Sequence, residues 1–129
     1  MHAIEDMLRH WLEDQPEIRL AYLFGSLARG QARRDSDVDL AIDTRSPLDA
    51  ARKAGMIEEL TALTGRPVDL VELAGAGEPL LGQVLDGRRL KGHDAAHAAL
   101  VLRHVMDAAD FLPYRDRILR ERRLAWTRG

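Results

Sequence analysis

The stretch that decides the fold runs from Gly25 to Asp39 and reads Gly-Ser-Leu-Ala-Arg-Gly-Gln-Ala-Arg-Arg-Asp-Ser-Asp-Val-Asp. It follows residues 18–24, an apolar and partly aromatic segment that predicts a buried strand ending at the glycine. Its last residues open the segment 37–43, in which charged and apolar residues alternate strictly, as in a strand with one buried face. The sequence therefore predicts two strands joined by a turn of small and polar residues.

Further elements follow on both sides of this stretch. Apolar residues at helical spacing predict a first helix over 4–12, which ends before Pro16. The other predicted elements are a helix 46–64 with Ser46 as N-cap, a strand 68–73, a short helix 80–85 closed by Gly87, and a helix from Asp94 to Pro113. This order predicts an α/β (α+β) fold, with a short mixed β-sheet flanked by helices and a C-terminal helical extension.

Composition sets limits on the class of protein. The 129 residues, 46% apolar and 31% charged, predict one globular domain. Cysteine is absent, so disulfides and thiolate metal sites are excluded. We find neither an apolar run of the length that a membrane span needs nor a signal-peptide pattern, and we therefore expect a cytoplasmic location. Six arginines lie within residues 113–129, although the net charge of the chain is −2, and this asymmetry suggests a tail that contacts a partner.

Three carboxylates are the candidate catalytic groups. Asp37 and Asp39 leave the same face of the predicted strand because they are two residues apart. Asp69, the second residue of the strand 68–73, faces the same way if the two strands are neighbours. Carboxylates this close repel one another unless a cation lies between them, and Mg²⁺ takes such oxygen ligands together with substrate phosphates. The pattern predicts a two-metal site, and the alternative is the solvated face of a half-exposed strand.

The turn is a candidate phosphate-binding segment. Gly25 ends a strand and Ser26 begins a tight turn, so that free backbone N–H groups and a hydroxyl can face an anion. The pattern is neither a Walker A loop nor a dinucleotide-binding glycine motif. Arg29 lies in the same turn, where it can contact a phosphate, a partner's acidic surface or a nearby carboxylate.

The spacing of these residues resembles a known superfamily. Gly25-Ser26, ten further residues, Asp37-Val38-Asp39 and then Asp69 on a following strand resemble the DNA polymerase β-like nucleotidyltransferases. Within that superfamily the chain is similar to the minimal nucleotidyltransferase (MNT) proteins, the antitoxins of MNT/HEPN toxin–antitoxin pairs. The resemblance covers residues 4–92 in element order. It implies a nucleotidyltransferase domain over 1–92, with 93–129 as a helical extension that is basic at its end.

The resemblance also implies roles for the site residues. Asp37 and Asp39 would bind two Mg²⁺ ions, and Asp69 would share one metal and help deprotonate the acceptor. Gly25 and Ser26 would hold the phosphates of ATP.

The implied reaction is transfer of AMP from ATP to a tyrosine hydroxyl of a HEPN ribonuclease toxin, which neutralises the toxin within a hetero-oligomer. The alternative is a non-catalytic antitoxin that inhibits its toxin by binding and occlusion.

Two further functions are disfavoured. Nucleotidyltransferases that modify small molecules usually carry a second, substrate-binding domain, for which 129 residues leave no room. Direct nucleic-acid binding is not expected, because the body of the chain is acidic and lacks an aromatic stacking platform.

Several remaining side chains have simpler interpretations. His93, His97 and His104 are expected at the surface rather than on a metal. Tyr114 and Trp126, which lie among the C-terminal arginines, are equally candidates for interface contacts or for a loosely packed terminus.

Overall fold

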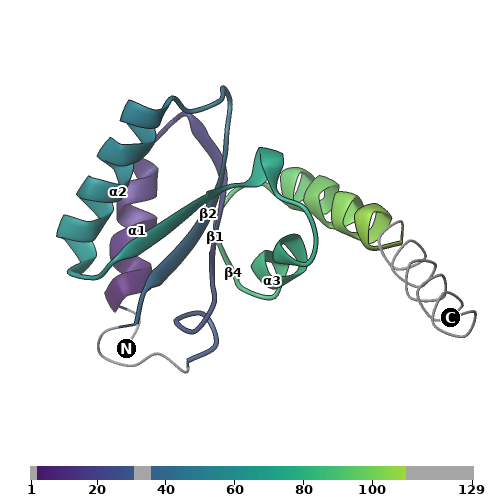
Figure 1. The fold of residues 1–129 in the computed structure, drawn as a ribbon, viewed down its shortest axis with the longest axis horizontal. Coiled ribbons are helices and arrows are strands. Elements are labelled where there is room, and N and C mark those ends of the chain that lie inside the picture. Colours follow the sequence, from purple (N-terminus) through teal and green to yellow (C-terminus); the bar gives the residue numbers. More distant parts are fainter. Residues whose placement is uncertain (1–2, 31–35, 110–129) are drawn as a thin grey trace, which may run out of the picture.

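A four-stranded sheet with helices on both faces forms the protein (Figure 1). The structure is a computed structural model that describes residues 3–30 and 36–109. The strand order is β3-β2-β1-β4. The strands are β1 (Ile18–Phe24), β2 (Val38–Thr44), β3 (Val68–Glu72) and β4 (Arg88–Lys91). β1 is antiparallel to both β2 and β4, whereas β2 and β3 are parallel, so the predicted mixed sheet is confirmed.

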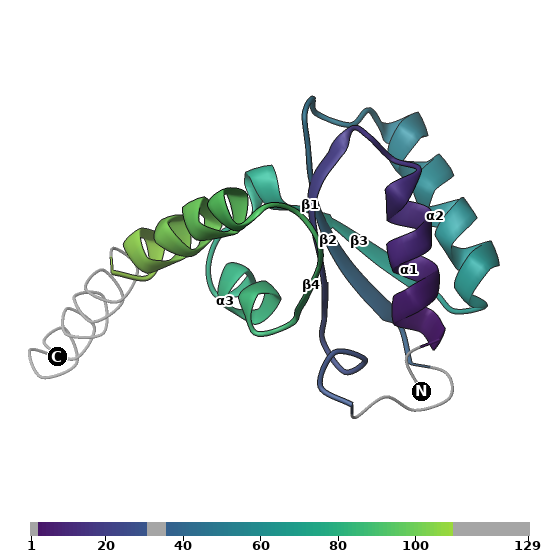
Figure 2. The ribbon, with the colours of Figure 1, turned by 180° about the vertical axis from the view of Figure 1, so that it is seen from behind.

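One face of the sheet is covered by two helices, α1 (Ala3–Glu13) and α2 (Ala50–Thr64), as Figures 1 and 2 show. Leu8 and Leu12 of α1 and Met56 of α2 meet the alternate strand residues, of which Leu40 and Ile42 are fully buried. Each such side chain contributes roughly 1.5–3 kcal/mol relative to an exposed one. This core holds the sheet in place, and the polar residues of interest lie on the opposite face of the same sheet.

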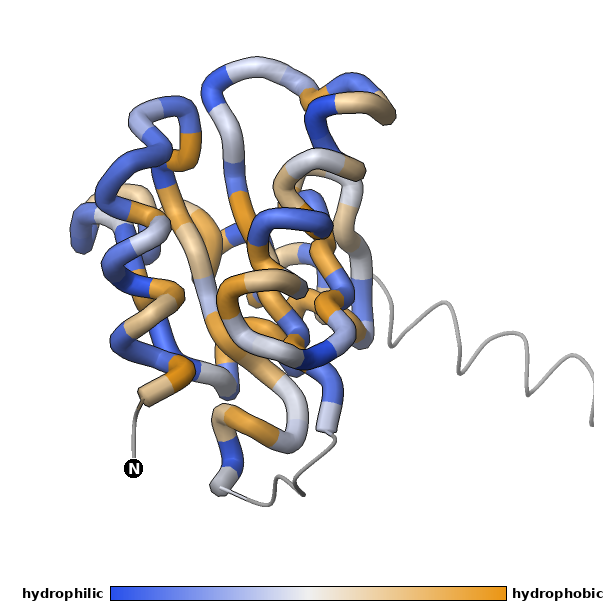
Figure 3. The backbone as a smooth tube through the Cα atoms, turned by 90° about the vertical axis from the view of Figure 1, so that its left-hand side faces the viewer, coloured by the Kyte–Doolittle hydropathy of each residue, from blue (hydrophilic) through white to orange (hydrophobic). Residues whose placement is uncertain are grey.

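The opposite face is covered only in part. A 3₁₀ turn η1 (Leu73–Gly75), α3 (Leu80–Leu85) and the helix 94–109 pack there, around buried Leu20, Tyr22, Leu81, Val84 and Leu100. In Figure 3 the strands inside the molecule are largely coloured hydrophobic, whereas α1 shows much hydrophilic colour. Because α3 is short, it leaves one end of this sheet face open.

Two histidines expected at the surface instead attach the helix 94–109 to the body. The Tyr22 hydroxyl and His97 Nδ1 form a hydrogen bond of 2.6 Å, and His104 Nδ1 lies 2.5 Å from Glu78 Oε1. Arg103 donates to the backbone carbonyls of Leu73 and Ala76. Both histidines are partly exposed, and these contacts were not predicted because helical spacing alone does not show which face finds a polar partner.

The structure differs from the predicted elements in three places. β4 was not predicted, because it has four residues of which only Leu90 is buried. The second helix begins at Ala50 rather than at Ser46, since the side chain of Asp49 caps it by accepting from the Arg52 N–H at 2.7 Å. Asp37 precedes β2 instead of opening it.

No helix in the part of the chain that the structure describes is long and apolar enough to cross a bilayer. The predicted break at Pro113, the six C-terminal arginines, Tyr114 and Trp126 lie outside the described residues.

Candidate active site

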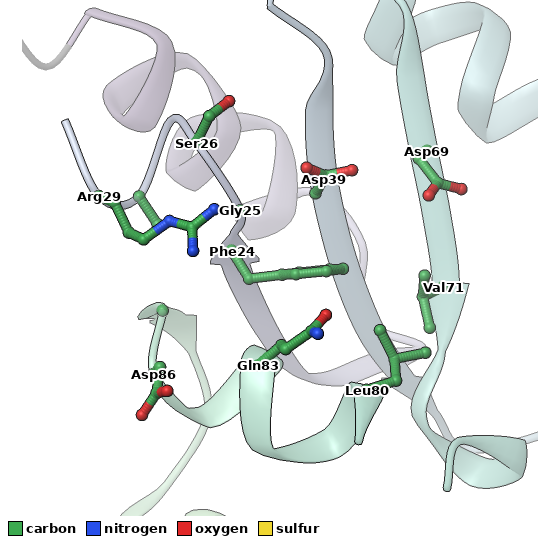
Figure 4. Close-up of a pocket in the computed structure, with 12 residues that line it drawn as sticks. Phe24, Gly25, Ser26, Arg29, Asp39, Asp69, Val71, Leu80, Gln83 and Asp86 are labelled. Carbon is green, nitrogen blue, oxygen red and sulfur yellow. The ribbon is translucent and has the colours of Figure 1, made fainter. Parts of the chain in front are cut away.

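The open end of the sheet forms a cleft of about 620 Å³ between the turn after β1, the strands β2 and β3, and α3 (Figure 4). The residues that line it are Phe24, Gly25, Ser26, Ala28, Arg29, Asp39, Asp69, Val71, Leu80, Gln83, Asp86 and Gly87. A volume of this size suits a nucleotide-sized ligand.

Strand register places Asp39 and Asp69 side by side. Asp39 is paired with Phe24 of β1 on one side and with Asp69 of β3 on the other. Neighbouring strands are about 4.8 Å apart, and paired residues project from the same face. Both carboxylates therefore project from the face on which α3 packs, at the end that α3 leaves open, and both line the cleft.

Gly25 allows the turn to pass directly over Asp39. Its φ is +75°, and a Cβ atom at this position would lie 2.2 Å from Asp39 Oδ2. The turn is held by hydrogen bonds from the Arg29 N–H to the Gly25 carbonyl at 3.2 Å and from Gly30 to Leu27 at 3.4 Å. Only glycine combines this left-handed backbone with such a close approach to the carboxylate.

The charges around Asp39 favour a cation. Burial raises the pKa of Asp39, and the nearby carboxylates of Asp69 and Asp37 raise it further, whereas Arg29 lowers it. Neither Asp39 nor Asp69 forms a hydrogen bond or ion pair with another described residue. Two adjacent carboxylates that form no ion pair with the described residues are a suitable pair of ligands for a hard cation.

Asp37 lies apart from this pair. It is exposed and does not line the cleft, although its charge acts on Asp39. Across residues 3–30 and 36–109, no three acidic, histidine or cysteine side chains gather into a metal-binding group. The arrangement fits Mg²⁺, which commonly takes one or two carboxylates and completes its shell with water and substrate phosphates.

The polar turn residues lie at one end of the cleft. Gly25, Ser26 and Arg29 belong to the turn, and Figure 4 shows the Arg29 guanidinium directed into the cleft beside Phe24. Arg29 is exposed, and its charge reaches Asp39. The turn thus offers a hydroxyl, backbone donors and one cation next to the two carboxylates.

Sequence reasoning missed the other wall of the cleft. Phe24, Val71 and Leu80 form an apolar surface, and Gln83 and Asp86 add polar groups from α3 and its C-terminal end. The alternation of β3 could have placed Val71 on the same face as Asp69. Nothing in the sequence placed α3 against that face.

Comparisons with known proteins agree with this geometry. The family described as "Polymerase beta, Nucleotidyltransferase" matches residues 6–96. The chain is 36% identical over 78 residues to the "Protein adenylyltransferase MntA" of Shewanella oneidensis, covering 60% of this chain and 56% of that protein. It is 38% identical over 60 residues to the protein of the same name from Thermococcus cleftensis, a match that covers 46% of this chain and 61% of that protein. The chain thus spans little more than half the length of these curated relatives.

A crystal structure of a toxin–antitoxin with AMP-PNP has the same fold. It superposes with a TM-score of 0.80 at 27% identity, over 91% of this chain and 96% of that one. Because the family match extends over more than half of its residues, the chain belongs to the polymerase beta nucleotidyltransferase family.

Proposed function

We propose that this protein is a Mg²⁺-dependent protein adenylyltransferase that transfers AMP from ATP to a tyrosine hydroxyl of a HEPN ribonuclease toxin, and so acts as its antitoxin. It works in the cytoplasm, in a hetero-oligomer with that toxin. The observation that carries the proposal is the pair Asp39 and Asp69 beside the Gly25 turn in one cleft. The names of the relatives and the AMP-PNP complex of a similar toxin–antitoxin chain support it.

The proposed roles follow from position. Asp39 and Asp69, with Asp37 at the outer edge, would hold two Mg²⁺ ions, which when bound would neutralise phosphate charge and polarise the phosphorus. Gly25 and Ser26 would donate to the terminal phosphates of ATP from the turn. Arg29 would add positive charge at the same end.

The reaction requires little covalent work from the protein. The acceptor hydroxyl oxygen forms a bond to the α-phosphorus of ATP, and the bond from that phosphorus to the β-phosphate bridging oxygen breaks. Pyrophosphate leaves with that electron pair, and the hydroxyl proton passes to Asp69. The chain contributes by orienting the phosphates and by holding carboxylates where charge is neutralised.

We also propose that residues 1–92 are the nucleotidyltransferase domain and that 93–129 are its extension. The packing of Leu100 and His97 against the sheet supports treating the described part, 94–109, as an attachment to the same core.

The experiment is transfer of label from α-³²P-ATP to the proposed HEPN toxin partner, with Mg²⁺. Asp39→Asn is expected to reduce AMP transfer at least about a thousandfold, because the site loses a carboxylate that would hold Mg²⁺ against the phosphates. Asp43→Asn is the matched control, since Asp43 lies on the same strand, β2, but forms an ion pair with Arg19 outside the cleft. It is expected to transfer AMP at the unsubstituted rate.

Two outcomes would overturn the proposal in different ways. Label transfer that survives Asp39→Asn would remove Asp39 from the reaction. Neutralisation of the toxin by the unsubstituted protein without any label transfer would identify a non-catalytic antitoxin that acts by occlusion.

A further inference from the structure

The helix 94–109 directs its polar side chains toward the body of the protein and an apolar face toward solvent. His97, Arg103 and His104 form the hydrogen bonds to the body described above, and Leu100 is buried beside them. On the surface helix of a globular protein the polar residues ordinarily face water and the apolar residues face the core. The reversed arrangement indicates that another molecule covers the outer face of this helix.

The outer face is a continuous apolar stripe. Leu102, Val105 and Met106 are 60%, 56% and 59% exposed, and among the described residues they are three of the five large apolar side chains that remain exposed. Exposed alanines extend the same side of the helix: Ala95, Ala98, Ala99 and Ala109. Spacings of three and four residues place all seven side chains, the outer stripe, on one side. Exposed apolar groups that gather in this way mark an interaction surface.

The order of sizes along the outer stripe makes it complementary to itself. Three alanines form its N-terminal half, and Leu102, Val105 and Met106 follow them. When two such helices run antiparallel, the alanines of each helix face the large side chains of the other, and the two backbones can approach closely. Parallel helices would place large side chains against large ones and would bring the like ends of their dipoles together. A two-fold axis across the stripe therefore gives the better packing.

Nothing on the outer stripe opposes a second copy of the chain. A surface that must not bind itself carries like charges or polar groups that would meet across the contact. From 95 to 109 the outer stripe has no charged side chain. The helix also projects from the side of the sheet opposite to α1 and α2 (Figures 1 and 2), so that a second helix can lie along it without meeting that layer.

We propose that the outer stripe pairs with the outer stripe of a second copy, antiparallel about a two-fold axis near Leu102, so that this chain forms a homodimer. The stripe is about 22 Å long at 1.5 Å per residue. Large side chains occupy only half of it, so the interface is a small one, and we expect a dimer Kd in the micromolar range. The inference does not depend on the proposed function, because no residue that lines the cleft belongs to this helix.

The first test is sedimentation velocity of the full chain alone, from about 1 to about 200 μM. The mass is expected to rise from that of one chain toward that of two. Leu102→Glu is expected to raise the dimer Kd at least about tenfold, because it places a charge in the apolar contact. Leu63→Glu is the matched control, since Leu63 is 41% exposed but lies on α2, on the other face of the sheet. It is expected to dimerise like the unsubstituted chain.

The second test is disulfide cross-linking, for which the chain is suited because it has no cysteine. Ala98 and Met106 lie four residues before and after Leu102, so the antiparallel pair brings each close to the other in the second copy. A mixture of Ala98→Cys and Met106→Cys chains is expected to form the mixed disulfide in preference to either self-linked product.

Three results would overturn the proposal. These are a chain that stays monomeric up to the highest concentration, a dimer that survives Leu102→Glu, and cross-linking in which self-linked products match or exceed the mixed one. If the chain is monomeric alone and Leu102→Glu weakens its binding to a HEPN toxin, the outer stripe belongs to the toxin contact and the homodimer is wrong. The proposed AMP transfer would stand in each of these cases.

Discussion

Asp39 occupies a position that is unfavourable for its own charge. Because burial and the neighbouring carboxylates raise its pKa in the folded state, the ionised form costs folding free energy above that pKa. Asp39→Asn is therefore expected to raise the Tm by a few degrees at pH 7. This gain in Tm should shrink as the pH falls through the raised pKa that Asp39 has in the folded protein. It should vanish below 3.8, the ordinary pKa of an aspartate, because the folded and the unfolded protein then both bind the proton. Thermal unfolding followed across this pH range measures the difference.

The control for this stability experiment is Asp43→Asn. Asp43 belongs to the same strand but already lies 2.9 Å from the Arg19 guanidinium, so its substitution is expected to give no gain at pH 7. A Tm for Asp39→Asn equal to or below that of the unsubstituted protein at pH 7 would contradict the electrostatic account of the site.

Gly25 can be tested separately for its backbone and for its contact. Gly25→Ala adds the cost of a left-handed alanine, about 1 kcal/mol, and also displaces the Asp39 carboxylate, because the new Cβ would lie 2.2 Å from it. Gly30→Ala shares the left-handed φ, +70°, but meets nothing within 4 Å. We expect both variants to lose similar stability and only Gly25→Ala to lose AMP transfer, by about a hundredfold or more. Equal transfer by the two variants would mean that the contact with Asp39 is unimportant.

At the residue scale, the acids and the turn could be predicted because their spacing is local. Period-2 alternation placed Asp39 on the face opposite Leu40, and the same rule placed Asp69 opposite Leu70. The position of Asp37 was less predictable, since the strand begins one residue later and leaves this carboxylate exposed at its edge. The left-handed φ of Gly25 follows from a glycine at a strand end, but its contact with Asp39 depends on the register of β1 and β2.

At the element scale, the turn between α3 and β4 packs directly against the backbone of β1. Gly87 passes so close to β1 that a Cβ atom would lie 2.2 Å from the Leu23 carbonyl oxygen, which is backbone and cannot rotate away. Gly87→Ala is expected to destabilise the fold by about 2–4 kcal/mol. Gly77→Ala is the control, because no atom lies within 4 Å of its Cβ position. Urea unfolding measures the free energy of unfolding of both variants. A loss below about 1 kcal/mol for Gly87→Ala would show that the backbone of the turn shifts to make room for the new Cβ.

The helices and long strands could be predicted, whereas β4 could not. α1 and β1 have apolar patterns strong enough to give their type and position, and β1 begins and ends where expected. β4 is Arg-Arg-Leu-Lys, a sequence with no strand pattern of its own. It forms because the chain after Gly87 runs along β1, where Arg88 pairs with Leu23. Such a strand depends on tertiary contacts rather than on local preference.

At the scale of the whole molecule, the cleft joins segments that are far apart in the chain. The turn and the acids come from the first 70 residues, and the wall with Leu80 and Gln83 comes from a later helix. Sequence patterns indicate which side of each element is buried, but they do not say where α3 lies on the sheet. That is why the end of the cleft with the turn and the two carboxylates could be predicted and the apolar end could not.

The cleft as a whole is expected to bind the nucleotide only together with Mg²⁺. Asp39 and Asp69 without a metal repel a triphosphate, so AMP-PNP in EDTA is expected to leave the Tm nearly unchanged. With Mg²⁺, AMP-PNP at about 100 times its Kd is expected to stabilise the fold by about 2.7 kcal/mol and raise the Tm by several degrees. The double variant Asp39→Asn/Asp69→Asn removes the repulsion and the ligands together, so its response to AMP-PNP should be weak and independent of Mg²⁺. Equal stabilisation of the unsubstituted protein with Mg²⁺ and with EDTA would show that these two carboxylates do not hold the metal.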